Sequence, residues 1–149
     1  MIQPKLLGAS LFALLSLFIS SQLFAQEAIE QRQKLMKGQS ANAKAIKGAV
    51  EAKDYATVEA KAKDIVGSSE KIVDLFPKGS TKGKTKATGA IWEKSDDFAK
   101  NAKNLRKAAS ELADAAKSGD AAAVDTKVKA MGDVCGACHK AFRAEKYSE

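Results

Sequence analysis

The chain has 149 residues, of which 45% are hydrophobic, 29% are charged and only 6% are aromatic. This composition is typical of a single helix-rich globular domain and excludes a disordered chain. The 25 basic and 18 acidic residues give a formal net charge of +7. The lysines are spread along the chain without interleaved aromatic residues. They therefore indicate a solvated surface, or a weak docking surface for an acidic partner, and not a nucleic-acid-binding protein.

Residues 1–25 have the pattern of a secretory signal peptide. Lys5 provides a positive start, Leu11 to Ile19 form an apolar stretch, and small or apolar residues lead to Ala25 as the cleavage point. The alternative is an uncleaved membrane anchor, but the apolar stretch is short of the ~20 residues that a spanning helix needs. We therefore expect an exported, periplasmic protein, with residues 26–149 forming one domain. This mature chain has 124 residues and a net charge of +6.

Four segments repeat apolar or small residues at alternating spacings of three and four, which predicts amphipathic helices. They run from about 27 to 53, 54 to 76, 89 to 118, and 120 to 142. No segment shows the period of two that is typical of a strand. Asp54 and Asp120 are expected as N-caps, and Gly119 as the residue that ends the third helix.

The connections between these segments predict the topology. Those near residues 53 and 119 are short and should join antiparallel neighbours. The connection at 77–88 is long and rich in Gly, Lys and Thr, so we expect it to be mobile. Four amphipathic helices of this size predict an all-α protein, an antiparallel four-helix bundle with no second domain.

The sequence CGACH at 135–139 contains both cysteines and the only histidine of the chain. Cys135 and Cys138 are three residues apart on a helix, so both thiols leave the same apolar face, and His139 follows directly. This C-x-x-C-H pattern is that of covalent c-type haem attachment. The thiols would form thioethers with the haem vinyl groups, and His139 would be the proximal iron ligand.

Three other interpretations of the motif are weaker. A thioredoxin-like redox pair would need a βαβ setting. A structural zinc site would need a carboxylate to complete four ligands. A disulfide within the helix would be strained.

The motif on the last of four helices resembles the class II c-type cytochromes, the cytochrome c′ and cytochrome c-556 group. The similar stretches are RQKLMKG (32–38), LFPKGS (75–80), IWEKSDDFAK (91–100) and VCGACHKAFR (134–143). The resemblance covers essentially the whole mature chain. It implies a periplasmic protein with one haem c. Class II proteins often pair through their first two helices, so the resemblance leaves both a monomer and a homodimer of this kind open.

The resemblance also raises the question of the sixth iron ligand. High-spin relatives leave this position open and bind small gases there, whereas low-spin relatives fill it with a methionine of the first helix, four residues after an arginine-like position. Met36 lies four residues after Arg32. Met1 leaves with the signal, and Met131 lies about 12 Å from His139 along the same helix. Met36 is therefore the expected distal ligand, the alternative being that it only packs against the haem.

Two further residues are assigned to the haem pocket. Met131, one turn before Cys135, is expected to pack against the haem. Arg32 either pairs with a haem propionate or is a solvated helix residue. Because the single histidine belongs to iron and no phosphate-binding loop is present, we expect no enzymatic activity. The expected function is electron transfer with periplasmic or membrane-bound redox partners, and the alternative is the binding of nitric oxide or carbon monoxide.

Overall fold

The computed structural model describes residues 7–146, with side chains from residue 23 onward. Its helices are α1 (Leu7–Glu51), α2 (Tyr55–Ser69), the 3₁₀ turn η1 (Val73–Leu75), α3 (Ala90–Glu93), α4 (Ser95–Ser118) and α5 (Ala121–Phe142). The described residues contain no strand, only an isolated antiparallel bridge between Ala87 and Arg143. The all-α prediction is confirmed.

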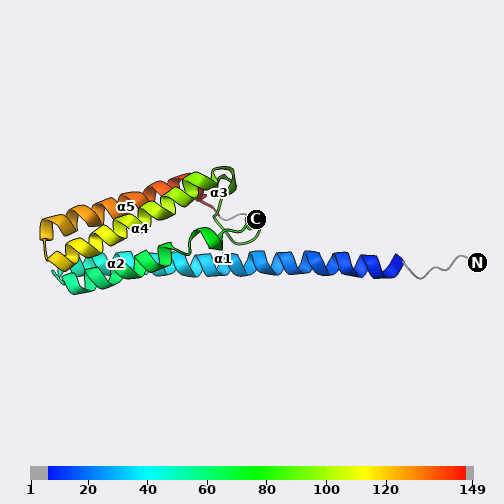
Figure 1. Cartoon of the computed structure of the whole chain (residues 1–149), viewed down its shortest axis with the longest axis horizontal. Helices are drawn as coiled ribbons and strands as arrows, with labels where there is room; N and C mark the ends of the chain where they lie inside the picture. The colour runs from blue at the N-terminus through cyan, green and yellow to red at the C-terminus, as the bar shows by residue number, and fades with distance from the viewer. Residues whose placement is uncertain (1–6, 147–149) are drawn as a thin grey trace, which may run out of the picture.

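The four long helices form an antiparallel bundle (Figure 1). α2 packs along α1 and α4, and α5 packs on α4. The contact between α1 and α5 is sparse, so these two helices diverge and leave space between them. The N-terminal part of α1 extends beyond the bundle.

The sequence signals at the helix ends act as expected. The Asp54 carboxylate accepts a hydrogen bond from the Thr57 amide at 3.1 Å, and the Asp120 carboxylate accepts one from the Ala123 amide at 3.0 Å. Each satisfies a backbone donor that has no partner in the first turn of a helix. Gly119 ends α4 in the left-handed conformation, with φ of 72°, which glycine adopts without steric cost.

Two of the expected helices are interrupted. α2 ends at Ser69, where the hydroxyls of Ser68 and Ser69 both donate to the carbonyl oxygen of Ile65; such bonds compete with the helical ladder. The third expected helix breaks at Lys94, whose ψ of 49° is not helical. The preceding turn, α3, is tied to the end of η1 because the Trp92 indole donates to the carbonyl oxygen of Phe76 at 2.9 Å.

The start of the first helix also differs, because α1 begins at Leu7 and not near residue 27. The proposed signal peptide, residues 1–25, therefore overlaps α1, and its first six residues lie outside the described part of the chain. Within residues 7–146, no helix has an apolar stretch long enough to span a membrane.

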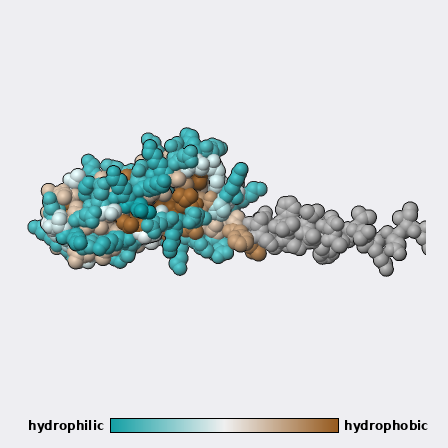
Figure 2. Space-filling model, viewed as in Figure 1, coloured by the Kyte–Doolittle hydropathy of each residue, from teal (hydrophilic) through white to brown (hydrophobic). Residues whose placement is uncertain are grey.

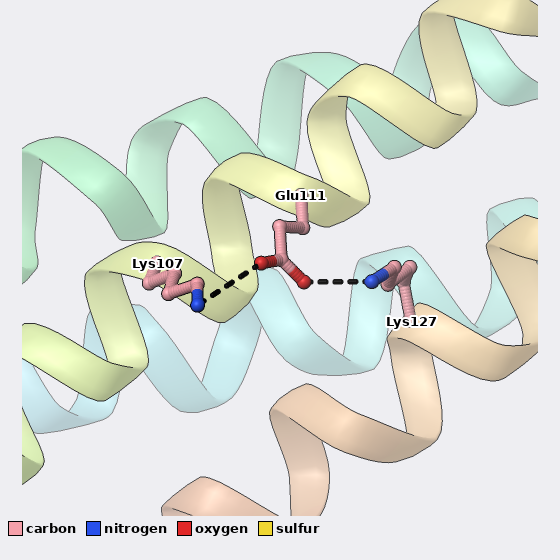
Figure 3. A network of polar contacts seen from close by, with 3 residues as sticks. All are labelled: Lys107, Glu111 and Lys127. Atoms are coloured by element: carbon pink, nitrogen blue, oxygen red, sulfur yellow. Dashed lines mark hydrogen bonds and ion pairs between the residues drawn. The ribbon is translucent and has the colours of Figure 1, made fainter.

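The core lies where α2 and α4 meet their neighbours. Its most deeply buried members are aliphatic residues from all four long helices: Ile46, Val58, Ala62, Ile65, Ala109, Leu112 and Val124. At the bundle surface, Glu111 of α4 pairs with Lys127 of α5 at 2.7 Å and with Lys107 at 3.8 Å (Figure 3). Because these side chains are partly or largely exposed, the pairs contribute little to stability, and the apolar core carries most of it.

Candidate haem site

Two adjoining cavities occupy the space between α1 and α5, with volumes of about 370 and 210 Å³. Both are lined by Met36 and Ser40 of α1 and by Cys138 and His139 of α5. The smaller cavity also reaches Cys135. The larger volume is within the range of small-molecule and cofactor sites. The cavities therefore bring together five of the six predicted site residues, two from α1 and three from α5, and the two groups lie more than 90 positions apart in sequence.

α5 presents the CGACH residues at one wall of these cavities. Cys135 and Cys138 are half-buried free thiols. Burial raises the pKa of both thiols, and for Cys138 the neighbouring Cys135 adds to this effect. His139 keeps solvent exposure, but its partial burial, together with the positive charge of Arg143, lowers its pKa. A neutral imidazole is the form that coordinates a metal.

A chain of aromatic rings forms another side of the larger cavity. Phe76 and Phe98 meet edge to face with centroids 4.9 Å apart, and Phe98 meets Phe142 in the same way at 5.2 Å. All three rings line the cavity. They come from the end of η1, from α4 and from α5, so this apolar wall exists only once the bundle has packed.

Arg32 is a buried cation at the edge of the larger cavity. Only 3% of the residue is exposed, so the interpretation as a solvated helix residue is wrong. Its guanidinium donates to the Ser80 hydroxyl, the Ser80 carbonyl oxygen and the Thr85 hydroxyl, each at 2.6 Å. It also lies 4.7 Å from the centroid of the Phe76 ring.

No carboxylate among the described residues forms an ion pair with Arg32. Burial lowers the pKa of Arg32 well below its usual value, to about 10, which corresponds to roughly 3 kcal/mol of lost solvation at about 1.4 kcal/mol per pKa unit. A buried cation beside a cavity is stabilised by an anion entering that cavity. Arg32 thus has the position and charge to receive a carboxylate of a bound group, such as a haem propionate.

The connection 77–88 is anchored on both walls of the site and is not the free loop that we expected. On the α1 side, Arg32 holds Ser80 and Thr85, and the Gln33 amide donates to the Lys84 carbonyl oxygen. On the α5 side, the Thr88 amide donates to the carbonyl oxygen of Phe142, and the Ala144 amide donates to that of Lys86. The connection therefore joins two helices that otherwise barely touch.

The sequence did not reveal Ser80 and Thr85 as site residues. Both are buried, with 0% and 3% exposure, although they lie in a stretch of Gly, Lys and Thr that looks solvated. The only available signal was the position of Ser80 within LFPKGS. Met131, by contrast, is buried in the core but is absent from the linings of both cavities, so its contact with haem remains a prediction.

The residues present fit a covalently bound haem. One wall contains the free thiols of Cys135 and Cys138 and the adjacent imidazole of His139. The lining is largely apolar and aromatic, and the buried Arg32 lies at the edge of the cavity. Within the described residues, no cluster of three or more Cys, His, Asp or Glu could hold a metal ion, which leaves the zinc interpretation without a ligand set there. The fold and the site thus define a four-helix-bundle haem protein of the c type.

Comparison with known proteins identifies the family. The sequence model described as Cytochrome C′ matches residues 27–143, and the chain belongs to this family of non-enzymatic haem proteins. Members carry covalent haem c, for which this chain has Cys135 and Cys138, and the family is typically periplasmic.

Individual relatives are named cytochrome c′, cytochrome c-554 or cytochrome c-556. Cytochrome c′ of Rhodospirillum rubrum is 42% identical over 85 residues, which cover 56% of this chain and 58% of that protein; the match thus spans little more than half of this relative. Cytochrome c-556 of Agrobacterium fabrum is 36% identical over 128 residues, 83% of this chain and 86% of that protein. The resemblance to the cytochrome c′ and c-556 group is confirmed.

Solved structures show the same fold. Cytochrome c′ of Thermochromatium tepidum superposes with a TM-score of 0.76 at 31% identity, covering 81% of this chain and 97% of that one. A second cytochrome c′, described as having ligand-controlled dimer dissociation, gives 0.75 at 30% identity, with the same coverage. Cytochromes c′ can therefore form dimers.

Proposed function

We propose that this protein is a periplasmic electron-transfer cytochrome with one haem c held by Cys135 and Cys138, and with His139 and Met36 as the axial iron ligands. The observation that carries the proposal is that Met36, from α1, lines both cavities together with Cys138 and His139 of α5. When bound, the haem supplies an iron centre that accepts and releases one electron.

The residues of this chain have distinct roles in the proposal. The two thioethers fix the cofactor to α5. His139 would bind iron from the α5 side, and partial burial lowers its pKa, which favours the neutral imidazole that coordinates a metal. The Met36 thioether would bind from the α1 side and does not titrate. Arg32 neutralises a propionate, and the three phenylalanine rings exclude water from one face. Methionine–histidine ligation favours a relatively high reduction potential.

The alternative function is that of a high-spin, gas-binding protein in which Met36 only packs beside the iron. It is favoured by the relatives named cytochrome c′, including the 42% identical protein of R. rubrum. The same fold serves both functions, and the difference between them is the sixth ligand.

Replacing the methionines in turn tests the ligand assignment. Wild-type ferric protein should be low-spin, show the weak near-infrared methionine-to-iron charge-transfer band, and bind carbon monoxide poorly when reduced. Met36→Leu should make the iron high-spin, remove the band and allow carbon monoxide to bind. Met131→Leu is the matched control, since Met131 is buried but lines neither cavity; it should keep the low-spin spectrum. A wild type without the band, unchanged by Met36→Leu, would establish the gas-binding alternative.

The remaining parts of the proposal have their own tests. Mass spectrometry of the periplasmic protein should show one haem that survives acid–acetone extraction, and a Cys135→Ser and Cys138→Ser double variant should lose it. The N-terminal residue of the mature protein should be Gln26. Self-association through α1 and α2 should give a dimer in sedimentation experiments.

A further inference from the structure

The charges around the candidate haem site are strongly one-sided. α1 has five basic residues and no acidic residue between Glu30 and Glu51, and the chain between Asp74 and Glu93 has four lysines and no acidic residue. After Asp133, the described end of the chain adds three basic residues against Glu145 alone. These three segments, which we call the basic face, thus hold twelve basic residues and one acidic residue.

The rest of the molecule has the opposite balance. Outside the basic face, residues 26–149 contain 12 basic and 17 acidic residues. The ion pairs that the structure shows in its described part lie within α2, within α4, between α4 and Glu70 at the end of α2, and between α4 and α5. The segments that contribute basic residues to the larger cavity therefore carry an excess of positive charge, and the remaining segments carry an excess of negative charge, a feature that the modest net charge conceals.

The lining of the larger cavity shows the same asymmetry at short range. It includes Arg32, Lys37, Lys86 and Arg143 but no aspartate or glutamate. Lys37 and Arg143 are exposed. With both propionates ionised, haem would carry a net charge of −2 in the ferrous state and −1 in the ferric state, so it would offset at most two of the eleven excess charges and leave the face strongly positive.

We infer that the basic face is a docking surface for an acidic protein surface, and that it directs a redox partner to the opening between α1 and α5. The inference rests on the proposed electron-transfer function, because a partner must approach the cofactor closely. Complementary charge raises the association rate and orients the encounter, mainly at low ionic strength. Figure 2 shows apolar surface gathered within a hydrophilic shell toward the end of the bundle from which α1 extends, which resembles the apolar centre and polar rim of transient interfaces.

The basic face is better suited to bind an acidic protein than an anionic membrane. Binding to an anionic bilayer usually adds apolar side chains that enter the lipid. Among described residues beyond the predicted signal peptide, Val73 is the only large apolar residue that is well exposed, at 44%. It lies in η1 and lines neither cavity. The basic face thus provides charge without an insertion element.

Titration of the ¹⁵N-labelled ferrous holoprotein with poly-L-glutamate tests the docking surface. At about 10 mM ionic strength, where charges act over about 30 Å, amide shifts should concentrate in residues 31–50, 77–88 and 139–146, and they should vanish at high salt. Shifts spread evenly over the molecule would overturn the inference.

Charge-reversal variants separate the local charge from the net charge. Lys37→Glu, at the cavity, and Lys84→Glu, in the connection, should each weaken polyglutamate binding about fivefold, the order expected for a two-unit charge change close to the ligand in water. Lys117→Glu is the matched control, an exposed lysine at the far end of α4 that changes the net charge equally; it should have little effect. Equal weakening by all three variants would overturn the inference.

Two further readouts separate competing explanations. The protein should bind vesicles containing about half phosphatidylglycerol no more tightly than it binds polyglutamate, when the two are compared at equal total charge. If it binds the vesicles more tightly and Lys37→Glu abolishes that binding, the basic face is a membrane-binding surface. Rapid carbon monoxide binding by the ferrous wild type would refute the electron-transfer proposal without altering the polyglutamate footprint. The two failures are therefore distinguishable.

Discussion

Replacing Arg32 with methionine should destabilise the protein more than any surface substitution. The change removes three hydrogen bonds of 2.6 Å from a charged donor, each worth about 1.5–3 kcal/mol, or about 6 kcal/mol together. The substitution also removes the cost of burying the guanidinium, whose pKa is lowered to about 10. Removing this cost adds about 3 kcal/mol to the free energy of unfolding. The net loss should be about 3 kcal/mol.

Thermal unfolding of the holoprotein, followed by far-ultraviolet circular dichroism, measures this loss. At about 2.1 cal/mol/K per residue, a loss of about 3 kcal/mol lowers the Tm of a chain of this size by about 12 °C. Arg32→Lys keeps the charge but not the planar fork, and should give an intermediate decrease. Arg106→Met is the control, because Arg106 pairs at 3.3 Å with Glu70 and both side chains are more than half exposed; it should cost less than about 1 kcal/mol.

The same variants test whether Arg32 also serves the haem. Removing a positive charge beside the cofactor favours the oxidised, more positive state, so Arg32→Met should lower the reduction potential. A decrease in Tm no larger than that of Arg106→Met would refute the assignment of Arg32 as the anchor of the 77–88 connection. A large decrease in Tm with an unchanged potential would refute the propionate contact alone.

Two further predictions concern the helix ends. Gly119→Ala should cost about 1 kcal/mol, because φ of 72° is unfavourable for alanine. Gly48→Ala within α1, where an added methyl group meets no atom, should instead stabilise the protein by about 0.5 kcal/mol. Urea titration of both variants measures the two changes in the free energy of unfolding, and equal effects would contradict this account. The pKa of Asp54 is lowered by hydrogen bonds from the Thr57 hydroxyl and amide. The ionised Asp54 carboxylate therefore stabilises the folded protein fully above its unfolded pKa near 3.8. This contribution is lost as the pH falls through the lower pKa of the folded state. Asp54→Asn should therefore make acid unfolding less steep below about pH 4, and an unchanged slope would show that the cap does not depend on charge.

The helices could be predicted from the sequence because their signals are local. The spacing of Val58, Ala62 and Ile65 defines one face of α2, and Asp54 and Asp120 begin helices by accepting hydrogen bonds from amides three residues away. The break at Lys94 could not be predicted, because α3 is turned by a bond between the Trp92 indole and the Phe76 carbonyl group, sixteen residues apart. The spacing of apolar residues along the sequence continues unchanged through such a break, so it does not indicate where the helix is interrupted.

The haem motif belongs to the part of this protein that the sequence alone determined. Two thiols and an imidazole within five residues take a defined arrangement on any helix, so CGACH indicated the cofactor without tertiary information. Helical periodicity likewise determined the bundle, and the family resemblance pointed to Met36.

Tertiary structure alone decided the environment of that motif. The width of the opening between α1 and α5 depends on how both helices pack on α2 and α4, and no local pattern encodes it. Arg32, on a lysine-rich helix, looked as solvated as its neighbours, yet Ser80 and Thr85, 48 and 53 residues away, bury it. The gathering of Arg32, Lys37, Lys86 and Arg143 around one cavity has the same origin. Local spacing sets helix faces, but burial and long-range charge depend on which distant segments the bundle brings together, and that is decided only when the core has packed.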